Sequence, residues 1–107
     1  MEKKIENIVR HAEVSEKAIE RYLGNVVKKL GGVCLKYSNA GAVGYPDRVA
    51  LMPQGVSLWF ELKSKGRKPE KIQQIRIGQL ESLGHAVYVA DGKQSINNAF
   101  RKLGYDL

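Results

Sequence analysis

Cysteine, histidine and long apolar stretches are scarce in this sequence. Its single cysteine, Cys34, cannot form a disulfide within the chain, which suits a reducing compartment. No apolar run reaches the roughly 18 residues of a membrane-spanning helix, and the N-terminus lacks the pattern of a secretion signal. The two histidines and the cysteine are scattered without ligand spacing, so no zinc site is expected. These absences predict a cytoplasmic protein that does not span a membrane.

Acidic residues are also few relative to basic ones. The 107 residues include 11 Asp and Glu against 18 Lys and Arg, which gives a formal net charge of +7 and a pI near 9.6. Such an excess favours a polyanionic partner and salt-sensitive association. An anionic membrane surface is less well supported, because no basic amphipathic helix with an aromatic face stands out. The 43% apolar content is enough for one domain with one core.

A predicted hairpin brings two acidic residues together. Apolar residues 48–51 and 56–62 flank a turn at Pro53-Gln54-Gly55. If the loop has three residues, with a type I turn and Gly55 in the left-handed conformation, Asp47 lies opposite Glu61. A two-residue or four-residue loop would shift the pairing by one and turn the two acids to opposite faces. Alternation along the strand also places Lys63 on the same face as Glu61.

This arrangement predicts a divalent metal site. Two neighbouring carboxylates repel each other and raise at least one pKa, unless a cation lies between them. Oxygen ligands of this kind suit Mg²⁺, for which Mn²⁺ can substitute. On residue types alone, an equal alternative is that Asp47 caps a turn while Glu61 and Lys63 form a solvated strand edge.

The order of these motifs resembles a known nuclease family. Gly44-Tyr45-Pro46-Asp47, the hairpin, Phe60-Glu61-Leu62-Lys63 and a following helix with Gln73 are similar to the virus-type replication-repair nuclease (VRR-NUC) family of the PD-(D/E)xK superfamily. The similarity extends from about Glu16 to about Asp91. It implies an α/β, restriction-endonuclease-like core with a mixed four-stranded sheet flanked by helices. It also implies metal-dependent hydrolysis of DNA, often branched DNA such as Holliday junctions, by a homodimer.

Apolar periodicity and turn residues give the element order helix, helix, three strands, helix, strand, helix. Residues 1–14 are predicted to form an N-terminal helical segment used for packing or dimerisation, and residues 15–107 the VRR-NUC-like domain. Ser15 is the expected N-cap of the second helix and Ser95 that of the last. Gly24 is a position where another backbone segment could approach that second helix closely. The predicted elements cover residues 3–12, 15–30, 33–38, 48–51, 56–62, 69–83, 86–90 and 95–103, with the buried strand 86–90 parallel to 56–62.

The predicted metal ligands are Asp47, Glu61, the main-chain carbonyl of Leu62 and Glu20. Glu20 lies beside the apolar stripe of the second helix, so its carboxylate can point toward the metal. The resembling nucleases also carry a glutamate on their first core helix. Glu16, one turn earlier, is the rival, although it could simply be an N-terminal helix charge.

The remaining site residues are expected to act on water and DNA. Lys63 is predicted to orient the attacking water and to offset negative charge in the transition state. Gln73 shares a helix face with core residues and is expected to position Lys63 or that water, as the resemblance implies, with Gln74 as the alternative. The candidate DNA contacts, which could otherwise be a solvated basic surface, are Lys36, Lys65, Arg67, Lys68 and Lys71. The alternative function is a non-catalytic DNA-binding or interaction module with a nuclease-like fold.

Overall fold

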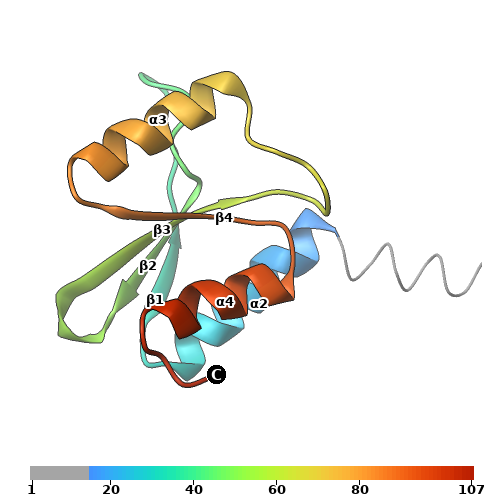
Figure 1. The fold of residues 1–107 in the computed structure, drawn as a ribbon, viewed down its shortest axis with the longest axis vertical. Coiled ribbons are helices and arrows are strands. Elements are labelled where there is room, and N and C mark those ends of the chain that lie inside the picture. Colours follow the sequence, from blue (N-terminus) through green and yellow to red (C-terminus); the bar gives the residue numbers. More distant parts are fainter. Residues whose placement is uncertain (1–14) are drawn as a thin grey trace, which may run out of the picture.

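The structure, a computed structural model, describes residues 15–107. The predicted helical segment 1–14 lies outside the described residues. One face of a four-stranded sheet packs against two helices, and the third helix lies on the other face (Figure 1). The helices are α2 (Glu16–Lys29) and α4 (Lys93–Lys102) on the first face and α3 (Lys71–Ser82) on the second. None of these described helices is long and apolar enough to cross a bilayer.

The sheet has the strand order β1-β2-β3-β4. Its strands are β1 (Val33–Lys36), β2 (Arg48–Met52), β3 (Val56–Leu62) and β4 (Ala86–Ala90). The first three strands pair antiparallel, and β4 returns through α3 to lie parallel to β3. The sheet is therefore mixed, and the predicted α/β fold with a four-stranded sheet flanked by helices is confirmed.

The β2–β3 hairpin has the predicted register but not the predicted turn. Arg48 pairs with Phe60 and Met52 with Val56, so the loop holds three residues. Gly55 is left-handed, with φ 75°, as expected. The type I turn is wrong, because Gln54 is left-handed too, with φ 68°. Consecutive positive φ angles suit the right-handed twist of a hairpin, and the number of loop residues sets the pairing whatever the turn type.

Helix α2 begins and ends as its sequence predicts. The Ser15 hydroxyl accepts a hydrogen bond from the Ala18 amide at 3.1 Å. Gly31, with φ 88°, follows the last turn. The buried face carries Ile19, Leu23, Val26 and Val27. Within residues 15–107 nothing approaches Gly24 closely, because a Cβ built there would meet none of their atoms within 4 Å.

The main core lies between α2, α4 and one face of the sheet. Phe60 of β3 and Phe100 of α4 are fully buried and stack with ring centroids 5.6 Å apart. Burying each ring contributes about 2–3 kcal/mol of hydrophobic free energy. Cys34 is partly buried and packs against this core. The prediction that residues 86–90 form a buried strand is wrong at Val89. This residue is 42% exposed, since β4 is an edge strand.

The start of α4 also differs from the prediction. The helix begins at Lys93, two residues before the predicted N-cap Ser95. The Ser95 hydroxyl nevertheless accepts hydrogen bonds from the amides of Asp91 at 3.1 Å and Gly92 at 3.2 Å. Ser95 therefore satisfies the exposed amides at this helix start from inside the first turn.

Helix α3 packs closely against the loop that leads to Asp47. Gly44 has φ 96°, and a Cβ built there would lie 2.8 Å from Ile72 Cγ1. Arg76 of α3 donates from Nε to the Val43 carbonyl at 3.0 Å and lies over the Tyr45 ring at 4.9 Å. Only glycine fits this backbone conformation and this contact without strain.

Candidate active site

The predicted acids meet at one end of the sheet. Because Arg48 pairs with Phe60, continuing the register by one residue places Asp47 opposite Glu61 and on the same face. The Asp47 carboxylate lies 3.5 Å from the Leu62 amide through Oδ1. The Asp47 carbonyl accepts a hydrogen bond from the Tyr37 amide at 2.8 Å, which holds the residue beside the end of β1.

Glu61 is a buried carboxylate with an unequal environment at its two oxygens. Its side chain is only 5% exposed. Oε1 accepts a hydrogen bond from Gln73 Nε2 at 3.0 Å and lies 3.6 Å from Lys63 Nζ. Oε2 is buried and has no hydrogen-bond partner within residues 15–107. Burial, followed by the Asp47 charge, raises the pKa of Glu61 to about 7, against the lowering effect of Lys63.

Gln73 is fixed by two hydrogen bonds that determine which way its amide points. Its Oε1 accepts from the Glu70 amide at 2.8 Å, so its Nε2 is directed to Glu61. The sequence-based alternative, Gln74, is exposed and donates from Nε2 to the Pro69 carbonyl at 3.0 Å. Gln73 is therefore the glutamine that reaches the site, where its contact is with Glu61.

The Leu62 main chain faces Asp47. The Lys63 amide donates to the Ala90 carbonyl of β4 at 3.0 Å. Since all peptide bonds in the described chain are trans, the Leu62 carbonyl points away from β4, toward the side of Asp47. Two carboxylates and one carbonyl thus lie at the same end of the sheet. Across the described chain, no group of three or more His, Cys, Asp or Glu side chains is placed to hold a metal.

The two helix acids have different surroundings. The Glu20 carboxylate forms an ion pair with Arg48, with Oε2 2.7 Å from Nη2, and its side chain is 49% exposed. The Arg48 hydrogen bond lowers the pKa of Glu20. Glu16 is exposed in the first turn of α2, and its charge contributes to the raised pKa of Glu61.

Arg48 is the site residue that sequence reasoning missed. It is one of two buried charged residues within 15–107, the other being Glu61. The signal was present, because an arginine directly after Asp47 occupies a β2 position whose alternate residues, Ala50 and Met52, face the core. A guanidinium group buried at that position requires an acidic partner.

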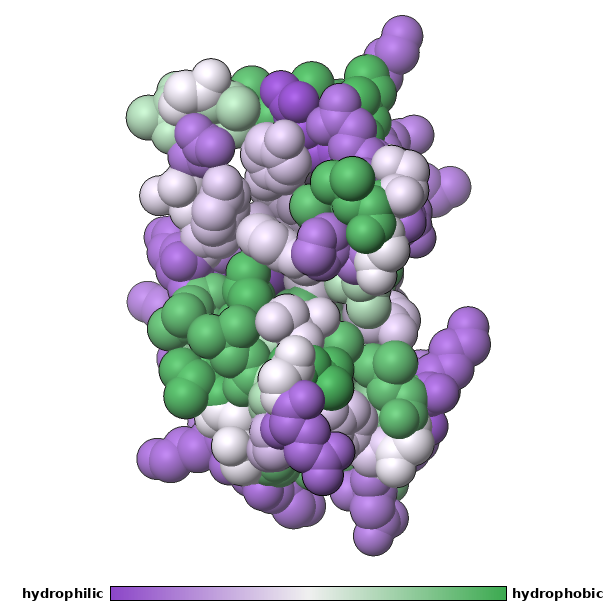
Figure 2. All heavy atoms as spheres, turned by 90° about the vertical axis from the view of Figure 1, so that its left-hand side faces the viewer, coloured by the Kyte–Doolittle hydropathy of each residue, from purple (hydrophilic) through white to green (hydrophobic). Residues whose placement is uncertain are grey.

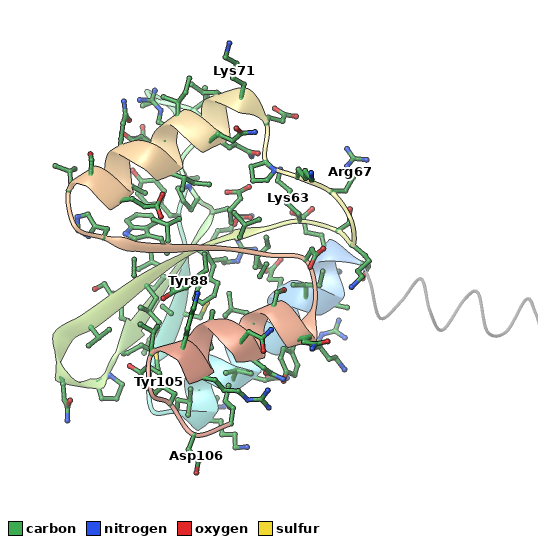
Figure 3. All side chains as sticks on the ribbon, viewed as in Figure 1. Lys63, Arg67, Lys71, Tyr88, Tyr105 and Asp106 are labelled. Atoms are coloured by element: carbon green, nitrogen blue, oxygen red, sulfur yellow. The ribbon has the colours of Figure 1, made fainter. Side chains whose placement is uncertain are left out.

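The five candidate DNA contacts are exposed, and none of them forms an ion pair within the described chain. They are Lys36, Lys65, Arg67, Lys68 and Lys71. Figure 3 shows Arg67 and Lys71 projecting from the loop and from the start of α3, on the side of the molecule where Lys63 lies. The Gly66 amide donates to Asp91 Oδ2 at 3.2 Å, which anchors the loop to the end of β4.

Comparison with known proteins agrees with this geometry. No family model matches the chain. A protein named "Putative nuclease p44", from Acyrthosiphon pisum secondary endosymbiont phage 1, is 36% identical over 80 residues, which cover 75% of this chain and 86% of the phage protein. A solved structure described as "VRR_NUC domain" superposes with a TM-score of 0.77 and 25% identity, covering 84% of this chain and 97% of that one. The chain therefore belongs to the VRR-NUC family of nucleases.

Proposed function

We propose that this nuclease is a metal-dependent endonuclease that hydrolyses phosphodiester bonds in DNA, with Mg²⁺ as cofactor and Mn²⁺ as a substitute. The observation that carries the proposal is Glu61 Oε2, a buried carboxylate oxygen without a hydrogen-bond partner in the described chain, on a residue that the strand register places opposite Asp47. Buried polar atoms in native proteins are almost always satisfied. A divalent cation would supply the missing partner and relieve the repulsion between Asp47 and Glu61.

The donor set fits a hard cation that keeps part of its water shell. Asp47, Glu61 and the Leu62 carbonyl offer oxygen atoms only, which suits Mg²⁺ or Mn²⁺ better than zinc. Water and the DNA phosphate would fill the other positions, so a cluster of three acidic side chains is not needed. When bound, the metal lowers the pKa of a water molecule and withdraws charge from the phosphate.

We further propose Glu16, and not Glu20, as the helix acid of the site. Glu16 stands in the first turn of α2, which lies at the end of the sheet where β3 ends (Figure 1). Its charge acts on Glu61, whereas the Glu20 carboxylate is paired with Arg48. Glu16 would add negative charge to the side of the site that faces α2.

The chain's own residues prepare the site for hydrolysis. Gln73 and Lys63 both engage Glu61 Oε1, which leaves Oε2 for the cation. The Lys63 ammonium, on the same face as Glu61, can hold the attacking water and offset the charge that develops on the phosphate. Because Gln73 is itself anchored to the Glu70 amide, the orientation of Glu61 is set before substrate arrives.

We propose branched DNA, such as a four-way junction, as substrate and a homodimer as the active form. The exposed residues Lys65, Arg67, Lys68 and Lys71 can bind phosphates, and such contacts carry no base information, so DNA shape would decide selectivity. Lys36 pairs with Arg48 and therefore lies on the opposite face of the sheet from Glu61. Exposed apolar side chains support a partner copy: Val33, Leu35 and Leu51 lie on one face of β1 and β2. Figure 2, which views the side where the hairpin lies, shows apolar groups gathered there. Two copies could make paired cuts across a junction.

The test is cleavage of labelled four-way junction, flap and linear duplex DNA, with Mg²⁺, Mn²⁺ or EDTA. Asp47→Ala and Lys63→Ala should each reduce the rate at least about 100-fold while DNA binding persists. Asp106→Ala and Lys102→Ala are matched controls, because Asp106 lies at the opposite end of the molecule from Lys63 (Figure 3) and Lys102 ends α4. Full activity in EDTA, or in the Asp47 variant, would contradict the proposal. Sedimentation of the free protein tests the homodimer.

A further inference from the structure

Arg48 joins α2 to the residue before β2 through three contacts of one guanidinium group. Its Nη2 lies 2.7 Å from Glu20 Oε2. Its Nη1 donates to the Asp47 carbonyl at 2.9 Å and lies 3.6 Å from Asp47 Oδ2. The Arg48 side chain is only 7% exposed, so this guanidinium is not available to bind a DNA phosphate.

The sheet register explains how Arg48 reaches Asp47. Arg48 pairs with Phe60, whose ring belongs to the core beneath α2 and α4. Its side chain therefore leaves the sheet on the face opposite to Glu61. Arg48 holds Asp47 from the core side, while the metal donors are on or near the other face.

The charge balance explains what Glu20 does. A buried guanidinium is costly unless it is paired and hydrogen-bonded. Arg48 also pairs across strands with Lys36, so two like charges are neighbours. Glu20 faces both cations, and together with Lys17 their charges favour its ionised form. Its carboxylate is thereby committed to Arg48.

We infer that Arg48 is a positioning residue that holds Asp47 in place and that Glu20 is the counter-ion of Arg48, not a metal ligand. This inference rests on the proposed metal-dependent function. The planar fork of arginine can contact a carboxylate and a carbonyl at once. Lysine keeps the charge but presents a single ammonium, so Arg48→Lys should release Asp47 without changing the net charge.

The first experiment measures catalysis and metal binding in Arg48→Lys. We expect kcat to fall about 10- to 100-fold, as is usual when a residue that orients a metal ligand is replaced, with KM for DNA unchanged because Arg48 is buried. Rates are expressed per folded molecule from near-UV circular dichroism, so that lost stability alone cannot produce the effect. Arg101→Lys is the control, because Arg101 is an exposed arginine that also donates to a main-chain carbonyl, that of Leu107. An unchanged kcat in Arg48→Lys would overturn the positioning role.

The second experiment titrates Mn²⁺ by electron paramagnetic resonance. Glu20→Gln keeps a hydrogen-bond acceptor for Arg48, so Mn²⁺ affinity should change by less than about threefold, with the same number of ions bound. A tenfold loss of affinity, or one ion fewer, would identify Glu20 as a ligand and overturn the inference. Asp47→Asn should weaken Mn²⁺ binding strongly in the same assay.

A third measurement needs no metal and separates the two claims. In urea unfolding with EDTA, the effects of Glu20→Gln and Arg48→Met should be coupled. The urea midpoint of the double variant should fall by less than the sum of the falls in the two single variants. Additive losses would show that the two residues do not act as a pair and would overturn the inference. If wild type bound no Mn²⁺, the proposed metal dependence would fail, while this cycle would still decide the pairing.

Discussion

Glu61 is the carboxylate on which most of the candidate site depends. Its Oε1 has two protein partners and its Oε2 none in the described chain, so the side chain is satisfied on one side only. Burial and the neighbouring Asp47 together disfavour its charge. In the folded protein without metal, ionising Glu61 therefore costs free energy, and this cost lowers the stability in a way that depends on pH.

We predict that this cost appears as a pH dependence of stability. The pKa of Glu61 rises from an ordinary 4.5 to about 7 on folding, so the folded state binds more protons between these values. Stability without metal should therefore fall as pH rises from about 4.5 to 7, by up to about 3 kcal/mol. Glu61→Gln lacks this titration, so its stability relative to wild type should increase over the same window. Urea unfolding in EDTA at several pH values measures the difference, with Glu81→Gln, on an exposed turn of α3, as control. A difference that does not vary with pH would contradict the prediction.

Sequence reasoning succeeded where a residue's position follows from strand parity and loop length. Those two features predicted that Asp47 and Glu61 are neighbours and that Lys63 shares the face of Glu61, and the register confirms the basis of both. It did not predict the pairing of Glu20 with Arg48, because the rotation of a helix about its axis is set by packing. A strand residue alternates between two faces, whereas a helix residue near the edge of an apolar stripe can point in several directions.

At the scale of elements, α3 and the loop before Asp47 support each other. The loop approaches α3 so closely at Gly44 that a methyl group there would contact Ile72. The same helix carries Gln73, which holds Glu61. The contact of Gly44 with Ile72 of α3 thus helps to fix Asp47 and Glu61 relative to each other.

The element-scale prediction is that Gly44→Ala weakens both folding and catalysis. The positive φ and the contact with Ile72 together should cost about 2–4 kcal/mol, and the shift of the loop should displace Asp47 and slow cleavage. Gly78→Ala is the matched control within α3, because a Cβ there meets no atom of residues 15–107 within 4 Å. It should stabilise the protein by about 0.5–1 kcal/mol. Thermal unfolding and cleavage rates of the two variants are the measurements, and equal effects would refute the proposed close contact.

The turn of the β2–β3 hairpin could be predicted from the sequence only in part. Pro53 and Gly55 were sufficient to predict a three-residue loop, and therefore the correct register. The left-handed conformation of Gln54 was not predictable, since glutamine has no preference for it. The twist of the hairpin imposes this conformation, which is a property of the paired strands and not of the turn sequence.

At the scale of the whole molecule, basic residues occur at both ends. The loop 64–68 and the start of α3 lie beside the acidic site, while α2 and α4 end together at the far side, where Lys28, Lys29 and Lys102 are exposed (Figure 1). The net charge of +7 would attract DNA to the protein as a whole. The proposed cleavage additionally requires that the phosphates be held near Asp47 and Glu61.

The last prediction separates local contact from net charge. A variant with Lys65, Arg67 and Lys68 all replaced by Ala loses three positive charges, and so does a variant with Lys28, Lys29 and Lys102 replaced. If the loop binds phosphates, the slope of log Kobs against log salt concentration should become shallower by about 2–3 in the first variant only. The binding is measured in EDTA, so that cleavage does not compete. Equal changes in the two variants would mean that overall charge, and not the loop, governs DNA affinity, because the loop and the helix ends would then contribute alike.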